Sequence, residues 1–429
     1  MKKKSNRLRD LRVLRGLVLI LLGWGSCPDI SVAQTPTPTA RPQRFEDPFE
    51  KFRKLPPEPP ALLPVERAWF VSLPMAPAAP GAIDETRVYI PLRDNWLFAL
   101  ARETGALLWR REVTAESAPI AQGDLLFVAG QGNIRALDAA SGDDRWSTPI
   151  GGGISAPLVW DAGWLFAVTP QAEVIALRAS DGREIWRHTL AAPAEHAPAP
   201  GGTDAIYLSL KNSHLVALRI TDGAVLWDQA LTGTLSPPTV APDRVYVGST
   251  DNYFYAFDAD KGKQEWKWRG GGDVIGSAYD GDLVYFASLD NIIRAVRPGN
   301  GNQQWKKETG TRPVLPPRAF GGVIVLPGLA PAITVFVAKT GAVMASHTAQ
   351  APDGSAQALL GPPLMDAEIK PFRVALVTMT RDGLVEGLRP TAMMFREMPV
   401  TPIAALPGRA LTREVSPLQR PTTTEPITH

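Results

Sequence analysis

Cysteine is nearly absent from this 429-residue sequence, which contains only Cys27. A single cysteine cannot form a disulfide bond within the chain, and it excludes a metal site built from several cysteines. Histidine is also scarce, and the five histidines are His188, His196, His214, His347 and His429. They show none of the spacings that bring imidazoles together on one metal ion. The sequence therefore predicts no metal site and no disulfide framework.

Neither sign of charge predominates in the chain. It has 45 basic and 43 acidic residues, and removing residues 1–33 takes away seven basic and two acidic residues and leaves 38 and 41. No basic stripe with interleaved aromatic side chains is present, so the pattern of a nucleic-acid-binding surface is missing. We therefore expect no nucleic-acid partner. The hydrophobic fraction of 45% is sufficient for a large folded core.

Long apolar runs are missing near the start of the chain. The apolar run Leu17–Leu22 follows seven basic residues and is too short for a comfortable transmembrane helix. Basic residues ahead of a short apolar run are typical of a secretory signal peptide, which we predict over residues 1–33. We therefore expect an exported protein.

Two processing sites are compatible with this signal. Ser31–Ala33 has the small residues of a cleavage site before Gln34, whereas Gly25–Cys27 resembles the end of a bacterial lipoprotein box. Trp24 stands where that box usually has leucine, which favours the first site. Cys27 is therefore either discarded with the signal or a lipid attachment point, and membrane association would depend on the second outcome.

Segments rich in proline flank the remaining sequence. Residues 34–64 contain nine prolines in 31 residues and predict an extended linker. Phe45, Phe49 and Phe52 lie at spacings of four and three there, which leaves open a short amphipathic turn that docks on a partner. Residues 391–429 are rich in proline and threonine and predict a disordered tail. Within that tail, the apolar segment Met393–Phe395 could dock on the folded part.

A repeat of about forty residues fills the chain between these segments. Its marker is a glycine followed four residues later by a tryptophan, and successive tryptophans are 37, 40, 41, 39 and 39 residues apart. Short strands and turn residues at this period are typical of a β-propeller with one four-stranded blade per repeat. The six pairs are Gly105/Trp109, Gly142/Trp146, Gly182/Trp186, Gly223/Trp227, Gly262/Trp266 and Gly301/Trp305.

Each position of the repeat has an expected structural role. The glycine should occupy a hairpin turn with positive φ, and the tryptophan should begin the outer strand, pack on the neighbouring blade and donate its N–H to a carbonyl. Second strands are predicted at segments such as Arg87–Pro91 and Phe372–Thr378. Third strands end in apolar-Ala-apolar triplets such as Phe98–Leu100, and small-residue-proline pairs such as Ala76–Pro77 mark the inner strands.

The repeats occupy residues 65–390, which gives eight units of about forty residues. The seventh unit keeps Gly341 but has Ala345 in place of tryptophan, and the eighth has no fourth strand after Leu384–Leu388. Trp69 lies in Ala68–Leu73, an outer strand with no blade before it. We predict that this strand completes the eighth blade, because a propeller must hide its sheet edges. The fold class is therefore all-β, an eight-bladed β-propeller with four-stranded antiparallel blades closed by an N-terminal strand.

The segments LDAASGDDRW, ending at Trp146, and FDADKGKQEW, ending at Trp266, resemble the repeats of the pyrroloquinoline-quinone-type eight-bladed propellers. The size, the secretion signal, the lipoprotein-like box and the eight compact repeats are also similar to the outer-membrane assembly lipoprotein family BamB. This second resemblance implies a non-catalytic periplasmic scaffold, monomeric and without a cofactor, that binds protein partners of the cell envelope. It also implies an outer-membrane lipid anchor if Cys27 is retained.

The alternative is a quinoprotein dehydrogenase on the same propeller, or a propeller that binds another small ligand. A resemblance to those enzymes would imply a vicinal cysteine pair and a carboxylate set around Ca²⁺, and no cysteine pair is present. Asp258, Asp260 and Gly262 look like part of a calcium loop but lack its third acidic ligand. Gly151–Gly153 and Gly270–Gly272 lack the helix and lysine of a phosphate loop and are interpreted as crossings between blades. We therefore expect no enzymatic activity.

The loops are therefore the part of the propeller where we expect a binding function. In a four-stranded antiparallel blade, the second-to-third turns and the outer-to-inner crossings share one face. We expect partners to bind there, although turn formation is the simpler role of each residue. The candidate residues are Asp94, Asn95, Asn133, Lys211, Asn212, Asp251, Asn252, Asp290, Asn291, Arg381 and Asp382.

Overall fold

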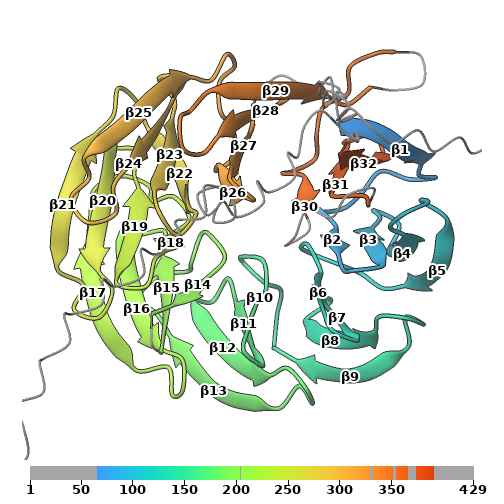
Figure 1. Cartoon of the computed structure of the whole chain (residues 1–429). Coiled ribbons are helices and arrows are strands. Elements are labelled where there is room, and N and C mark those ends of the chain that lie inside the picture. Colours follow the sequence, from blue (N-terminus) through green and yellow to red (C-terminus); the bar gives the residue numbers. More distant parts are fainter. Residues whose placement is uncertain (1–64, 203, 329–331, 351–353, 366–372, 391–429) are drawn as a thin grey trace, which may run out of the picture. The chain divides into compact units, whose positions relative to one another are not determined.

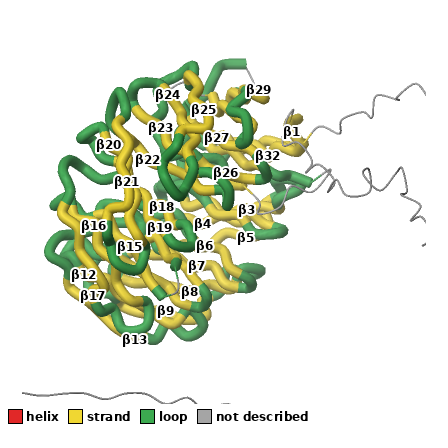
Figure 2. Tube along the Cα trace, turned by 60° about the vertical axis from the view of Figure 1, so that its left-hand side comes forward, coloured by secondary structure: helices red, strands yellow, loops and turns green. Residues whose placement is uncertain are grey.

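The computed structural model describes residues 65–202, 204–328, 332–350, 354–365 and 373–390. The predicted signal peptide, linker and tail, with Cys27, lie outside these residues, as does the whole of a first unit that spans Met1–Pro56. The described residues form strands and no helix, so no helix among them could cross a membrane (Figure 2). The strands lie in eight four-stranded antiparallel sheets, arranged as blades around a ring (Figure 1). The predicted eight-bladed β-propeller is therefore confirmed.

Each blade runs from an inner strand to an outer one. The inner strands are β2 (Ala82–Ile83), β6 (Ile120–Gln122), β10 (Val159–Asp161), β14 (Ala199–Gly201), β18 (Thr239–Val240), β22 (Val274–Tyr279), β26 (Arg318–Phe320) and β30 (Leu364–Met365). The second strands are β3 (Arg87–Pro91), β7 (Leu125–Gly130), β11 (Trp164–Val168), β15 (Ala205–Ser209), β19 (Arg244–Gly248), β23 (Val284–Ser288), β27 (Val323–Pro327) and β31 (Leu376–Met379).

The third and outer strands complete the blades. The third strands are β4 (Trp96–Ala101), β8 (Asn133–Asp138), β12 (Glu173–Arg178), β16 (His214–Arg219), β20 (Tyr253–Asp258), β24 (Ile292–Val296), β28 (Ala332–Val337) and β32 (Leu384–Pro390). The outer strands are β5 (Leu107–Glu112), β9 (Asp144–Pro149), β13 (Glu184–Thr189), β17 (Val225–Ala230), β21 (Gln264–Arg269), β25 (Gln303–Glu308), β29 (Val343–Thr348) and β1 (Val65–Ser72).

Blade 8 is assembled from two distant parts of the chain. Strand β1 pairs antiparallel with β32, in a register that runs from Val65 opposite Pro390 to Ser72 opposite Leu384. The blue and red strands lie side by side in Figure 1. The prediction that Ala68–Leu73 completes the last blade is therefore confirmed.

Three details of the sequence interpretation are wrong. The tryptophan is the third residue of the outer strand, because the turn after the glycine needs only one residue before pairing starts, as at β5. Ala76–Pro77 lies before β2 and outside it, because Pro77 already pairs with Leu92, just beyond the end of β3. Strand β31 begins at Leu376 rather than at Phe372, which lies outside the described residues.

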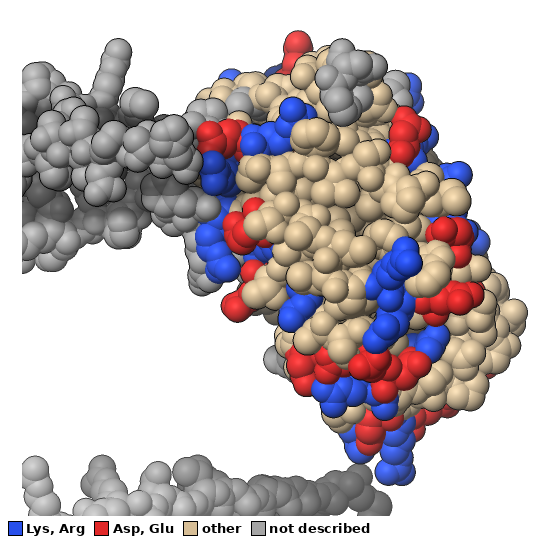
Figure 3. Space-filling model, turned by 90° about the vertical axis from the view of Figure 1, so that its right-hand side faces the viewer, with Lys and Arg blue, Asp and Glu red and all other residues tan. Residues whose placement is uncertain are grey.

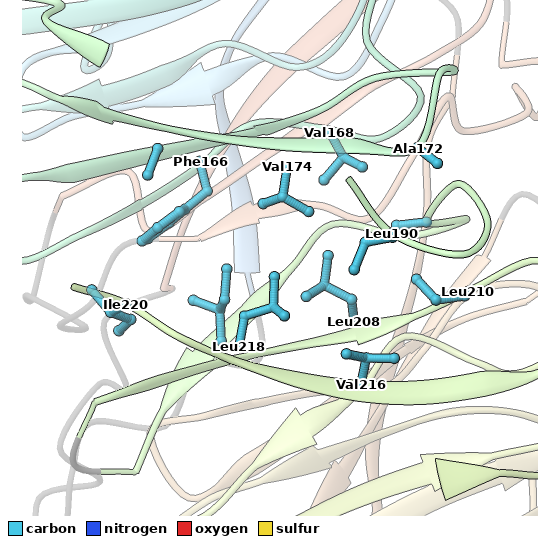
Figure 4. Close-up of a cluster of buried hydrophobic side chains, with 13 residues drawn as sticks. Phe166, Val168, Ala172, Val174, Leu190, Leu208, Leu210, Val216, Leu218 and Ile220 are labelled. Atoms are coloured by element: carbon cyan, nitrogen blue, oxygen red, sulfur yellow. The ribbon is translucent and has the colours of Figure 1, made fainter. Parts of the chain in front are cut away.

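The apolar core is divided among the seams between blades. Eight clusters of buried hydrophobic side chains are present among the described residues, one for each pair of neighbouring blades. At the seam between blades 3 and 4, Phe166, Val168 and Val174 face Leu208 and Leu218 (Figure 4). Each blade therefore depends on both neighbours for its stability.

The two faces of the ring carry different loops. The backbone N–H of Val113, after β5, donates to Asn95 O in the second-to-third turn of the same blade at 2.7 Å, and Ile150 N donates to Gly132 O at 2.9 Å in the next blade. The turns and crossings therefore share one face, which we call the crossing face. The opposite face carries the hairpins that contain the repeat glycines, and we call it the Gly-turn face.

Candidate functional site

Seven tryptophans join blades to one another. Each indole Nε1 donates to a backbone carbonyl in the next blade at 2.6–3.1 Å, and the tryptophan side chains are buried or half-buried. The donors and acceptors are Trp69 to Arg102, Trp109 to Ala139, Trp146 to Ala179, Trp186 to Ile220, Trp227 to Ala259, Trp266 to Pro298 and Trp305 to Ala338. We call each such contact a staple.

The repeat glycine of the next blade completes each staple. Gly105, Gly142, Gly182, Gly223, Gly262, Gly301 and Gly341 have φ of 64–75°. A Cβ on any of them would also come within 3.0 Å of the ring of the preceding tryptophan. Glycine is therefore required at each of these positions for two reasons: it permits a left-handed φ, and it leaves room for the indole.

A small residue lies opposite each tryptophan inside its own blade. The register pairs are Trp109 with Ala99, Trp146 with Ala136, Trp186 with Ala176, Trp227 with Ala217, Trp266 with Ala256, Trp305 with Ala295 and Trp69 with Gly387. In blade 7 this register pairs Ala345 with Val335. The seam between blades 7 and 8 is the one without a staple among the described strands.

A buried carboxylate lies at the seam between blades 7 and 8 instead. Glu386 of β32 is 2% exposed, and its Oε1 accepts from Arg67 Nη1 of β1 at 3.0 Å. Its Oε2 accepts from Thr378 Oγ1 at 3.4 Å and lies 3.5 Å from His347 Nε2 of β29, which is longer than a well-formed hydrogen bond. Burial alone would raise the pKa of Glu386, but His347 and Arg67 hold it below its ordinary value of 4.5.

The second-to-third turns of the crossing face depend on left-handed residues. Asn95, Asn252 and Asn291 have φ of 65°, 70° and 60°, a conformation that asparagine tolerates better than most residues. Ala172 and Ser213 occupy equivalent positions with φ of 64° and 67°, whereas Gln131, with φ of 54°, is the first residue of a shorter turn in which Gly132 takes the equivalent place. Turn geometry therefore accounts for these three of the five asparagines that the sequence interpretation singled out.

Two of the candidate carboxylates are engaged within the crossing face. Asp251 accepts from Tyr255 Oη at 2.6 Å, from the backbone N–H of Tyr253 at 2.9 Å and from the Thr232 hydroxyl. Burial opposes its ionisation, but the bonds from Thr232 and Tyr255 lower the pKa of Asp251 below its ordinary value.

Asp290 has a comparable role at the next blade. Its carboxylate accepts from Arg294 Nη2 and from Ser288 Oγ, both at 2.6 Å, and from Gly271 N at 3.2 Å. Burial again opposes ionisation, and Arg294 and Ser288 lower the pKa of Asp290. These two residues tie turns to crossings and have little capacity left for a partner.

Of the remaining candidate residues on the crossing face, two make hydrogen bonds through their side chains and seven do not. Asn95 Oδ1 accepts from Thr114 Oγ1 at 3.1 Å, and Asn133 Nδ2 donates to Gln131 O at 2.9 Å. Seven candidate side chains make no hydrogen bond or ion pair to the described residues: Asp94, Lys211, Asn212, Asn252, Asn291, Arg381 and Asp382. All seven except Asn252, which is partly exposed, are exposed and so are available to a partner.

The sequence interpretation did not identify the exposed apolar residues on the crossing face. Met75 is 42% exposed in the crossing from β1 to β2, and Val314 is 45% exposed in the crossing from β25 to β26. The Met75 crossing touches the turns of both neighbouring blades, since Arg93 N donates to Ala76 O at 3.1 Å and a Cβ on Gly383 would lie 3.2 Å from Met75 O. The signal for Met75 was an apolar residue between prolines in a loop.

Glu116 was also missed. Its Oε1 accepts from Gln131 N at 3.0 Å and its Oε2 from Ile154 N at 3.3 Å, so one side chain joins successive crossings and a turn. A hollow of about 320 Å³ nearby is lined by Gln131, Asn133, Arg135 and Trp146, among others. The Arg135 guanidinium is paired with Asp144 at 2.9 Å, which neutralises the charge that a ligand would meet there.

No group of three or more histidine, cysteine, aspartate or glutamate side chains in the described part of the chain is arranged to hold a metal ion. Asp258 acts as a turn cap, because its Oδ1 accepts from Asp260 N at 3.1 Å and from Lys261 N at 2.8 Å. Gly151–Gly153 and Gly270–Gly272 lie between an outer strand and the next inner strand, as predicted.

The stapled ring and its loop-bearing face define a non-helical repeat scaffold of the eight-bladed propeller class. The model of the family described as outer membrane protein assembly factor BamB matches residues 66–148, 130–237 and 211–378, and the chain belongs to that family. The outer membrane protein assembly factor BamB of Nitrosomonas eutropha is 25% identical over 188 residues, which are 40% of this chain and 44% of that protein. The chain therefore spans less than half the length of this curated relative.

Solved structures are similar in fold. BamB from Moraxella catarrhalis superimposes with a TM-score of 0.60 at 15% identity, over 76% of this chain and 99% of that one. A quinohemoprotein alcohol dehydrogenase from Pseudomonas putida HK5 superimposes with a TM-score of 0.57 at 13% identity, over 85% and 79%. At these identities the likeness extends to the fold alone, so function rests on the residues of this chain.

Proposed function

We propose that this protein is a non-catalytic periplasmic scaffold that binds protein partners in outer-membrane protein assembly through its crossing face. Membership of the BamB family supports the process. The division of the two faces supports the site, because the Gly-turn face is committed to the staples while exposed side chains on the crossing face have no partner among the described residues. A lipid anchor at Cys27 and a monomeric state belong to the same proposal.

The observation that carries the proposal is the surroundings of Met75. This exposed apolar side chain lies in a crossing that touches two turns, and those turns present Asp94, Arg381 and Asp382. An apolar anchor within a rim of charged residues is the usual composition of a binding hot spot. The turn at Lys211 and Asn212 provides a second, wholly polar patch on the same face.

The proposed binding through the crossing face can be tested by using the purified protein to capture the outer-membrane assembly machinery from the same cells. We expect the pair Met75→Ser and Arg381→Ser to weaken capture by about 2 kcal/mol, and the pair Lys211→Ser and Asn212→Ser to weaken it less. The control pair, Arg183→Ser and Lys339→Ser, changes exposed cations on the Gly-turn face and should leave capture unchanged.

Loss of capture in the control alone, or in none of the variants, would overturn the proposal.

Titration with pyrroloquinoline quinone and Ca²⁺ addresses catalysis separately. We expect no stoichiometric binding, and saturation at one quinone per chain would favour the dehydrogenase instead.

A further inference from the structure

Strand β29 of blade 7 differs from every other outer strand. The outer strands are the open edges of their sheets, and natural proteins usually protect such edges with charged side chains. Each of the other seven outer strands contains at least one lysine, arginine, aspartate or glutamate, whereas β29 has the sequence VMASHT. The edge of β29 therefore lacks the usual protection against pairing with another segment.

Exposed apolar side chains border this edge. Val343 is 59% exposed, Met344 is 36% exposed, and Phe70 of β1 in the next blade is 47% exposed. Phe70 pairs with Glu386, and residues directly opposite one another share a face of the sheet. Because Glu386 meets His347 of β29, Phe70 lies on the face toward blade 7. We call these three residues the apolar rim.

The surface around this part of the ring is largely uncharged. Figure 3 shows the side of the molecule that carries β1 and β5, where a broad tan area is bordered by charged residues. Exposed apolar side chains such as Val343, Met344 and Phe70 within an uncharged surface are a common feature of contact sites.

The chain leaves blade 8 at the Val343 end of the apolar rim. Pro390, the last residue of β32, pairs with Val65 at the Gly-turn face, and β29 begins at that same face two residues after Gly341. The sequence that follows Pro390 is TAMMFREM. Its apolar residues Met393–Phe395 are three to five residues from Pro390, within about 10–18 Å for an extended chain. Packed sheets lie about 10 Å apart, so this segment can reach β29.

We propose that Met393–Phe395 packs on the apolar rim and covers the open edge of β29. The other strand edge next to blade 8 is β5, whose first residues Leu107 and Leu108 are also exposed, at 51% and 50%. It continues with Arg110, Arg111 and Glu112, and so fits an apolar segment less well than the uncharged β29. The chain thereby protects its one uncharged edge with its own continuation. A consequence is that the predicted disordered tail begins with an anchored segment.

Disulfide formation between engineered cysteines tests the contact. In the full chain with Cys27→Ser, the variant Val343→Cys with Met394→Cys carries only the two new thiols. The matched control is Val225→Cys with Met394→Cys, since Val225 is the first residue of β17, is 49% exposed and likewise follows its repeat glycine by two residues. We expect the first pair to form an intramolecular disulfide at least about tenfold faster, because docking raises the effective concentration of the thiols.

Equal rates for the two pairs would overturn the proposal. Covalent dimers in place of the intramolecular product would also overturn it and would assign the apolar rim to a second copy of the chain. Hydrogen exchange gives an independent readout that needs no new thiol. Deleting residues 391–429 should accelerate exchange of the β29 amides and leave those of β17 unchanged, and unchanged protection of β29 would contradict the docking.

Discussion

The seam between blades 4 and 5 and the seam between blades 7 and 8 join neighbouring sheets by different means. At the first, Trp227 packs against Tyr207 and Phe257 with ring centroids 5.7 and 6.4 Å apart, within a cluster of eleven buried hydrophobic residues. At the second, the cluster in the described residues has five members and no aromatic ring. Glu386 and its partners Arg67 and His347 lie beside it.

The difference shows that ring closure and seam strength are separate matters. The chain closes in blade 8, yet the seam between blades 8 and 1 keeps the staple of Trp69, and the buried Arg102 donates to Val374 O at 2.8 Å across it. The unstapled seam lies one blade earlier. Apolar seams derive their strength from area and shape, whereas a seam held through a buried carboxylate depends on pH and on complete pairing.

Removal of β1 should have the largest effect on this arrangement. Deleting residues 1–75 removes the outer strand of blade 8 and the Trp69 staple, so both the edge of β32 and the seam with blade 1 are exposed. We expect aggregation and loss of a cooperative thermal transition. Deleting residues 1–64 leaves every described strand in place and should leave a stable monomer. A stable monomer from both deletions would show that β1 is dispensable for closure.

Two glycine-to-alanine substitutions measure how much the steric contact within a staple contributes to stability. Gly262 and Gly123 both have positive φ, 64° and 60°, but a Cβ on Gly262 would lie 2.5 Å from Trp227 Cδ2, whereas no atom lies within 4 Å at Gly123. Gly123→Ala should therefore cost about 1 kcal/mol, the price of a left-handed alanine. Gly262→Ala should cost about 3 kcal/mol, because Trp227 must also move. Urea unfolding of the two variants measures the difference, and equal costs would mean that the staple adapts freely.

Most of the fold could be predicted from the sequence because its period is carried by residues with strict steric needs. Gly262 cannot be replaced without both a φ penalty and a clash with the indole of Trp227 in the preceding blade, and Trp266 makes the same demand on Gly301 in the next blade. The spacing from glycine to tryptophan therefore recurs visibly. The inner strands were harder to locate. They are as short as two residues, as at β2, and the crossings that precede them vary in length.

The candidate face was less predictable than the fold. Turn composition identified Asp251 and Asn252 together, but only the structure distinguishes a carboxylate bonded to Tyr255 from an asparagine whose side chain has no partner among the described residues. Glu386 could not be identified from the sequence for a different reason. Its partners Arg67 and His347 are 319 and 39 residues away in the sequence, and no local pattern links them.

Replacement of Glu386, at the seam without a staple, should give the smallest change in stability, with a characteristic dependence on pH. The pKa of Glu386 is depressed below 4.5, so its ionised form stabilises the fold above that pH, and this contribution is lost as the pH falls through the lower pKa of the folded state. Glu386→Gln removes the charge that Arg67 and His347 share. It should cost about 2 kcal/mol at neutral pH, the typical worth of hydrogen bonds to a buried charge.

The pH dependence distinguishes this loss from a simple packing defect. Urea unfolding should show the gap between Glu386→Gln and the unmodified chain shrinking below about pH 4.5, because the carboxylate then takes up a proton in the unfolded chain first and in the native chain only as the pH falls further. Glu66→Gln is a suitable control, since Glu66 pairs with Arg389 at 2.6 Å on the surface of the same blade, with side chains 46% and 43% exposed. Such exposed pairs contribute between about 0 and 1 kcal/mol. A gap for Glu386→Gln that stays constant from neutral to acidic pH would mean that its shape, rather than its charge, holds blades 7 and 8 together.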